Sequence, residues 1–318
     1  MTTEIPSTMH AWRKHMGSPD PVWEEVAVPS TPPTGFLIKM LASGGSRRLW
    51  NYSESWCPSQ KRFKIQSGTV MWLRLMPYQA AALMIAQNVL AMYHNYVCDV
   101  NILALDKTAI MRRVTPAEAA VATDAVKTGY HAITRRGEVK AHETVFLFGL
   151  GGLGFNALQT IHHIGARVIV SDVKEELLEE AVKLGIPRGD IVPVGKSPTE
   201  FIIENGLDGK IDTVLDFVGM HQTFHDAQVI VRRGGKIVCV GTLDHENVVD
   251  MKNGIRKRLS FIFSYGGQLD DLEEVLELIS KKVIQPQVVG KPPSEFPGTL
   301  HGLLDGKIKG RIALMYDQ

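Results

Sequence analysis

The sequence predicts an α/β fold built around a doubly wound parallel sheet, and two observations indicate this. From about residue 114 onward, apolar runs of strand length alternate with helical patterns, as in consecutive βαβ units. The strand runs are nearly continuous in apolar residues, which is typical of strands that helices cover on both faces. A chain of 318 residues is long enough for one large domain or two medium ones.

The order of the elements follows from these patterns. Strands are expected over 144–149, 167–172, 190–194, 212–219, 235–241, 259–265 and 310–316. Helices are expected over 153–165, 175–185, 198–206, 221–235 and 270–282. Gly165 and Gly185 stand where C-capping glycines end two of these helices. Near the N-terminus, 35–40 is expected as a strand that ends in Ala-Ser-Gly-Gly, and the loop after it is expected to begin at Ser46.

The segment 46–113 differs from the rest of the chain in composition. It has one glycine in 68 residues, whereas the other 250 residues hold 28, and it has three acidic residues against nine lysines or arginines. Only 77–96 has a helical pattern. Because tight hairpins need turn residues, this composition is not typical of a small β-barrel and marks a boundary in the chain.

Charge and cysteine content exclude several classes of partner. A formal net charge of +1 gives no electrostatic argument for binding nucleic acid or an anionic membrane. The N-terminus lacks the apolar region of a secretory signal, and the most apolar run, 80–93, is too short to span a bilayer. Three scattered cysteines form no disulfide framework. These features predict a reduced, cytoplasmic protein.

The motif with the greatest weight is Gly149-x-Gly151-x-x-Gly154, which follows a predicted strand and opens a predicted helix. Gly149 would allow a tight turn, Gly151 would let the backbone approach a pyrophosphate, and Gly154 would let the helix pack closely on the strand. The predicted cofactor site therefore includes the loop residues Gly149, Leu150, Gly151, Gly152, Leu153 and Gly154.

An acidic residue completes this dinucleotide-binding pattern. Asp172 ends the next strand, 18 residues beyond Gly154, where a carboxylate would accept hydrogen bonds from the adenosine ribose. Because a carboxylate repels a 2′-phosphate, NAD is favoured over NADP. The alternative is a glycine turn that binds nothing. The glycines in 216–219 and 239–242 also lie at strand ends, where either a ligand or a plain turn would explain them.

Longer segments then point to a family. The stretches 115–133, 144–159, 165–176, 211–219, 234–242 and 305–314 resemble, in order and spacing, the zinc-dependent alcohol dehydrogenase branch of the medium-chain dehydrogenase/reductase superfamily. This resemblance implies a Rossmann domain preceded by a GroES-like β-rich domain, incomplete here, to which the last strand returns. It divides the chain into 1–124 (with 46–113 atypical), 125–285 and 286–318.

The resemblance also implies roles for further residues near the cofactor. Thr128 matches the threonine near the nicotinamide, and Val218 and Val240 match residues that line its pocket. Arg311 matches the arginine that reaches the pyrophosphate. The alternatives are a threonine on a helix face, two core valines and a surface arginine.

The zinc expected from the family lacks most of its ligands in this sequence. Asp124 matches the third ligand position, but Ser46 and Arg47 stand where the family places its first cysteine and the following histidine. No Gly-His-Glu occurs, and the four-cysteine lobe is absent. No catalytic residue is predicted; packing or surface roles are favoured for the histidines that could replace a ligand or base, namely His131, His162, His163, His221, His225 and His245.

The predicted function is therefore an NAD(H)-dependent oxidoreductase of alcohol dehydrogenase type, acting on a small-molecule alcohol or carbonyl substrate, whose activity the lack of zinc ligands would impair. One alternative is a zinc-independent quinone or enone reductase, in which 46–113 belongs to a diverged catalytic domain. The other is a non-catalytic NAD-binding protein or the product of a faulty gene model; a mis-spliced exon or shifted frame is our preferred explanation of 46–113. Homo-oligomerisation, with 259–265 as an edge strand, is a family expectation.

Overall fold

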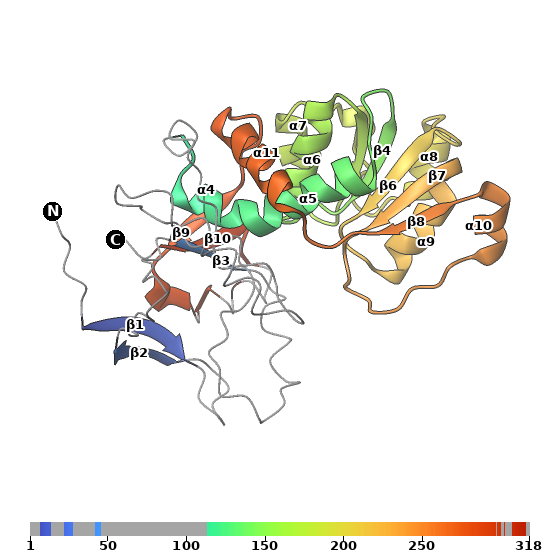
Figure 1. Ribbon diagram of the computed structural model, residues 1–318. Helices are drawn as coiled ribbons and strands as arrows, with labels where there is room; N and C mark the ends of the chain where they lie inside the picture. Colours follow the sequence, from blue (N-terminus) through green and yellow to red (C-terminus); the bar gives the residue numbers. More distant parts are fainter. Residues whose placement is uncertain are drawn as a thin grey trace.

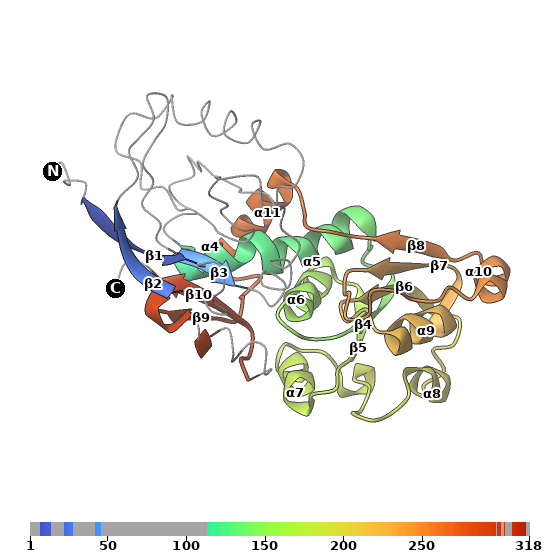
Figure 2. The same cartoon turned by 90° about the horizontal axis from the view of Figure 1, so that it is seen from below.

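The computed structural model describes residues 7–13, 22–27, 42–45, 113–296, 298–299, 302 and 307–315. The strand expected over 35–40, the helical pattern over 77–96, and the positions of Ser46 and Arg47 lie outside the described residues. Figure 1 and Figure 2 show a large sheet with helices on both faces, and a smaller group of strands that α4, α5 and α11 separate from it. Within the described residues, no helix has both the length and the apolar character needed to cross a membrane.

The large sheet is parallel and five-stranded, with the order β5-β4-β6-β7-β8. Its strands are β4 (Thr144–Phe148), β5 (Arg167–Ser171), β6 (Ile211–Asp216), β7 (Val231–Cys239) and β8 (Ser260–Phe263). The connecting helices are α6 (Gly154–Ile164), α7 (Glu175–Lys183), α8 (Pro198–Glu204) and α9 (His221–Ile230). The predicted doubly wound parallel sheet is confirmed.

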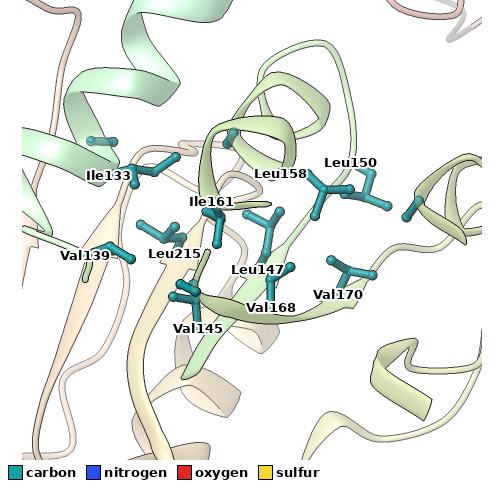
Figure 3. Packing of buried hydrophobic residues seen from close by; sticks show 14 of the residues in the cluster. Ile133, Val139, Val145, Leu147, Leu150, Leu158, Ile161, Val168, Val170 and Leu215 are labelled. Carbon is teal, nitrogen blue, oxygen red and sulfur yellow. The ribbon is translucent and has the colours of Figure 1, made fainter. Parts of the chain in front are cut away.

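Both faces of this sheet are buried, as the continuous apolar runs predicted. On β4, Val145 and Leu147 point to one face, and Phe146 and Phe148 point to the other. Figure 3 shows the first face packing against α6 and its neighbours. The helix residues on this face include Leu158, Ile161, Leu178 and Ala181. Those on the second face, from α8 and α9, include Phe201, Ile202, Phe224, Ala227 and Ile230.

Strands from the two ends of the chain form two smaller sheets. β1 (Thr8–Arg13) pairs antiparallel with β2 (Val22–Ala27). In the second sheet, β10 (Arg311–Met315) pairs antiparallel with β3 (Ala42–Gly45) and parallel with β9 (Val288–Lys291). The last strand therefore returns to the N-terminal part, as the resemblance implies. β3 is the Ala-Ser-Gly-Gly with which the sequence was expected to end its N-terminal strand, and β10 supplies these residues with a pairing partner.

A run of helical segments connects the two groups of strands. It consists of α4 (Pro116–Val121), η2 (Ala122–Val126), α5 (Lys127–His131) and η3 (Ala132–Arg136), of which η2 and η3 are π-helical. The run begins at a capping box in which the Thr115 side chain accepts from the Glu118 backbone and the Glu118 side chain accepts from the Thr115 backbone. Ala119, Ala122 and Val126 of this run pack against α11 (Leu269–Ser280).

Other predictions of elements were wrong or incomplete. No strand forms over 190–194: residues 188–190 form the turn η4, and only Ile191 bridges to Val170. Pro193 has no N–H to continue the pairing. The helix expected over 221–235 ends at Ile230, where β7 begins. The helix α10 (Met251–Lys257), strand β9 and turn η5 (Pro293–Glu295) were not predicted.

Lys257 at the end of α10 binds the carboxyl end of α9. Its ammonium donates to the carbonyls of Gln228 at 3.3 Å, of Val229, and of Val231 at 2.8 Å. Because the last carbonyls of a helix have no intrahelical partner, a cation there satisfies them and matches the helix dipole.

Lys257→Met is expected to lower the free energy of unfolding by about 1–2 kcal/mol, since it keeps the aliphatic stem and removes the charged donor. Urea denaturation measures this. Lys252→Met is the matched control, because Lys252 is exposed on the same helix. Equal stability of the two variants would contradict the capping role.

Candidate cofactor site

The glycine loop between β4 and α6 is shaped by backbone contacts that admit no side chain. Gly149 has a φ of +87°, in the left-handed region. A Cβ on Gly154 would lie only 1.8 Å from the carbonyl oxygen of Gly149, so the first turn of α6 sits directly on the loop. The sequence assigned Gly149 to the tight turn and Gly154 to close packing, and the geometry of both residues agrees.

Gly151 and Asp172 lie on the open side of the same loop. A Cβ on Gly151 would have no atom of the described residues within 4 Å, which leaves room for a ligand to approach the backbone. The Leu150 N–H donates to Asp172 Oδ2 at 2.6 Å, and the Lys174 N–H donates to Asp172 Oδ1 at 2.9 Å. The acidic residue therefore stands beside the loop, at the carboxyl ends of β4 and β5, where open α/β sheets bind ligands.

The turn after β6 lies against the loop and is held by a buried carboxylate. Asp216, 1% exposed, accepts hydrogen bonds from the N–H groups of Val218 and Gly219 at 2.9 and 2.8 Å. The Thr223 hydroxyl donates to its other oxygen at 2.9 Å. Burial raises the pKa of Asp216 above its ordinary value, although these three hydrogen bonds act in the opposite direction. Sequence analysis missed Asp216; its place before the turn Phe-Val-Gly was the available signal.

The residues predicted to line the nicotinamide pocket lie in different environments. Val218 adjoins Gly149, since its Cγ2 would lie 2.7 Å from a Cβ there. Val240 is 7% exposed within the hydrophobic cluster that contains Leu150. Its position therefore also agrees with the alternative of a core valine.

The two strand-end glycines after β6 and β7 have a packing role. A Cβ on Gly219 would lie 2.1 Å from the Gly241 carbonyl oxygen, and one on Gly241 would lie 2.2 Å from the Val218 carbonyl carbon. Two backbones thus touch here. This contact explains both glycines without a ligand.

The helical run that carries Thr128 is fixed to the glycine loop through Asn156. Thr128 is 7% exposed on α5, and the neighbouring Gly129 packs on Ala157 of α6. The Asn156 amide donates to the carbonyl of Gly152 at 2.9 Å and to that of Ala125 at 3.4 Å. Sequence analysis did not single out Asn156, because its partner Ala125 lies in a distant element.

Asp124 and Arg311 meet at the other side of the loop. A guanidinium nitrogen of Arg311 lies 3.5 Å from Asp124 Oδ2, and the two side chains are 11% and 49% exposed, respectively. A Cβ on Gly152 would lie 2.7 Å from Arg311 Nε. Arg311 is therefore not a surface arginine, and that alternative is wrong. The structure brings together three residues that the sequence analysis assigned separately to zinc, pyrophosphate and loop.

The histidines considered as replacement ligands do not converge on this site. His131 Nδ1 lies 2.7 Å from Asp271, and His221 Nδ1 lies 2.9 Å from Asn247. His162 and His163 line a surface pocket with Gln159, Leu184 and Val283. His225 is largely exposed and His245 is exposed. Across the described part of the chain, no three His, Cys, Asp or Glu side chains are grouped so that they could hold a metal ion.

Comparisons with known proteins find similarity to dehydrogenases and reductases. Residues 152–281 match the family model described as zinc-binding dehydrogenase. An alcohol dehydrogenase from Geobacillus stearothermophilus is 31% identical over 192 residues, which is 60% of this chain and 55% of that protein. An acryloyl-coenzyme A reductase from Sulfurisphaera tokodaii is 32% identical over 181 residues, which is 55% of this chain and 52% of that protein. The matched part thus spans about half the length of each relative.

A solved structure extends the likeness of the fold. The acetophenone reductase from Geotrichum candidum, determined in complex with NAD, superposes with a TM-score of 0.75 and 21% identity. The superposition covers 99% of each chain. At this identity, the comparison shows a shared fold.

Proposed function

Because the chain belongs to the medium-chain dehydrogenase/reductase superfamily, we propose that it is an NAD(H)-dependent oxidoreductase of alcohol dehydrogenase type. The observation that carries this proposal is the glycine loop at the start of α6, with the Asp172 carboxylate 2.6 Å from its Leu150 N–H. The substrate would be a small alcohol or carbonyl compound. The superposed reductase was solved with NAD, which supports the choice of cofactor.

The described residues fit a nicotinamide dinucleotide. The open space at Gly151 would admit the pyrophosphate to the N-terminus of α6, whose first N–H groups and dipole favour anions. Asp172 would accept hydrogen bonds from the ribose hydroxyls, and Arg311 would bind a phosphate. Thr128, Val218 and Val240 would orient the nicotinamide. When bound, the cofactor supplies or accepts the hydride at its C4 atom.

Zinc does not fit the described residues, so no step is assigned to it. Asp124, the matching ligand position, faces Arg311. This observation favours a second candidate function, a zinc-independent reductase of enones or related acceptors that polarises the substrate oxygen with hydrogen bonds. One relative is named an acryloyl-coenzyme A reductase, and this name supports the second candidate. The third candidate is a non-catalytic NAD-binding protein, or the product of a faulty gene model over 46–113.

The remaining proposals concern organisation. We retain the division into 1–124, 125–285 and 286–318, a cytoplasmic location and a homo-oligomer. β8 is an edge strand of the described parallel sheet, as expected, and could pair with a second copy.

Three measurements test the proposed function in sequence. NADH binding is followed by the cofactor's fluorescence. Alcohol oxidation and ketone or enone reduction are then assayed with and without added zinc. Turnover without zinc would favour the reductase, zinc-dependent turnover would favour the zinc enzyme, and binding without any turnover would favour the non-catalytic protein. Failure to bind NADH would refute the proposal. Transcript sequencing across residues 40–115 tests the gene model.

Asp172→Asn is expected to raise the ratio of NADPH to NADH affinity by about tenfold, because it removes the charge that repels a 2′-phosphate. The amide oxygen can still accept from Leu150. Fluorescence titration with both cofactors measures the ratio, and thermal unfolding checks that the variant folds. An unchanged ratio would mean that Asp172 only holds the loop.

A further inference from the structure

The ion pair between Asp124 and Arg311 joins two residues to which the family resemblance gives different tasks. Asp124 Oδ2 lies 3.5 Å from the guanidinium of Arg311. A metal ligand offers its lone pairs to a cation, whereas a guanidinium beside the same carboxylate opposes a second positive charge. We propose that Asp124 is the counter-ion of Arg311, not a zinc ligand, and that it weakens the attraction of Arg311 for the cofactor's pyrophosphate. This inference rests on the proposed function.

The location of Arg311 connects the ion pair to cofactor binding. Its Nε and Cδ atoms would lie 2.7 and 3.0 Å from a Cβ on Gly152, so the side chain runs along the glycine loop. That loop leads into the 11-residue helix α6, whose N-terminus is a favourable place for phosphate. The Arg311 side chain is 11% exposed, and salt screens a charge in such surroundings less than it screens one in open water.

Both partners of the ion pair are held by regular structure. The Arg311 N–H donates to the Gln287 carbonyl at 2.8 Å, and β10 pairs with strands on both sides. Asp124 belongs to η2. The Asn156 amide donates to the Ala125 carbonyl of η2 and to the Gly152 carbonyl of the glycine loop, and so holds η2 beside the loop. The pair is therefore positioned by the junction of three elements, unlike a contact between two freely moving surface side chains.

A counter-ion at this place has a defined effect. With its carboxylate in place, the cofactor's pyrophosphate meets a partly neutralised guanidinium. Without the carboxylate, more of the guanidinium's positive charge acts on the phosphates. The cofactor then binds more tightly and leaves more slowly. Asp124 therefore sets how easily the cofactor is exchanged.

The test uses the full chain and four variants. Asp124→Asn removes the charge, and Glu200→Gln removes the same charge from an exposed position on α8, on the opposite face of the sheet from α6. Arg311→Gln and the double variant complete a mutant cycle. We expect Asp124→Asn to lower the Kd of NADH and of ADP-ribose by about threefold to tenfold at low salt. The gain should shrink at high salt and vanish in the Arg311→Gln background. Glu200→Gln should leave both Kd values unchanged.

A zinc measurement separates the two roles of Asp124. Equilibrium dialysis with metal analysis should give the same zinc content for the wild type and Asp124→Asn. One zinc per wild-type chain that Asp124→Asn loses would overturn the proposal. If the wild type binds NADH and Asp124→Asn binds it equally or more weakly, the counter-ion proposal is overturned. The proposed function remains intact in that case. A wild type that binds no NADH would refute the proposed function and this inference with it.

Discussion

Gly154→Ala is expected to lower the free energy of unfolding by about 3 kcal/mol or more, although alanine favours helix by about 1 kcal/mol over glycine. The new Cβ would lie 1.8 Å from the Gly149 carbonyl oxygen and 2.8 Å from its carbonyl carbon. Neither is a flexible side-chain end, so α6 or the loop must move. Movement of either would displace the residues proposed to hold the pyrophosphate, and NADH affinity should fall by more than tenfold.

Gly151→Ala is the matched control for that variant. Its Cβ would meet no atom of the described residues within 4 Å, so stability should stay within about 0.5 kcal/mol of the wild type. Its methyl group would stand where the pyrophosphate is proposed to approach, and NADH affinity should fall by about tenfold. Chemical denaturation measures the free energy of unfolding of both variants, and fluorescence titration measures their NADH affinity. A stable Gly154→Ala would contradict the close packing, and unaltered NADH binding by Gly151→Ala would contradict the assignment of the loop.

Asp271→Ala is expected to destabilise the protein by about 2–3 kcal/mol. Asp271 on α11 is 1% exposed and accepts from His131 Nδ1, Arg135 Nε and the Gln268 N–H at 2.7, 2.8 and 2.7 Å. Loss of the Asp271 carboxylate leaves these donors without their acceptor and removes the hydrogen bonds that join α11 to the helical run. Glu274→Gln is the control, because Glu274 bonds the same Arg135 but is 44% exposed, and it should cost less than 1 kcal/mol.

The same network makes stability depend on pH. Burial raises the pKa of Asp271, but the hydrogen bonds from Arg135, Gln268 and His131 outweigh it and hold the pKa below its ordinary value of 3.8. The carboxylate therefore stabilises the fold fully above pH 3.8, and the contribution is lost as the pH falls through the lower, folded-state pKa. The difference in stability between the wild type and Asp271→Ala should shrink in acid. A difference that stays constant from pH 6 to pH 3 would exclude this linkage.

Local pattern was sufficient for the elements of the parallel sheet and for the glycine loop. The interiors of strands such as β4 and β5 are apolar because both faces are buried. Gly149 and Gly154 have positions that only glycine can occupy, and Gly151 adjoins open space. Short elements with mixed composition gave no such signal. α10 has exposed apolar residues, and β9 exists because β10 lies beside it.

Contacts between distant elements were the part of the site that sequence could not predict. Asp124 and Arg311 lie 187 positions apart in the numbering, and only the return of β10 brings them together. The amide of Asn156 and the carboxylate of Asp271 likewise act on other elements. A single sequence assigns each residue a type and a local setting, but partners of this kind depend on the tertiary fold.

The pairing of β10 with β3 has a consequence for the residues between β3 and α4. β3 ends at Gly45, α4 begins at Pro116, and these two elements contact one another. The two ends of the framework that flank residues 46–112 therefore lie at one place. The entropy of joining two neighbouring points by a chain segment grows only with the logarithm of the segment's length. Exchange of one inserted segment for another, by splicing or by recombination, would therefore cost the framework little and leave the cofactor half in register.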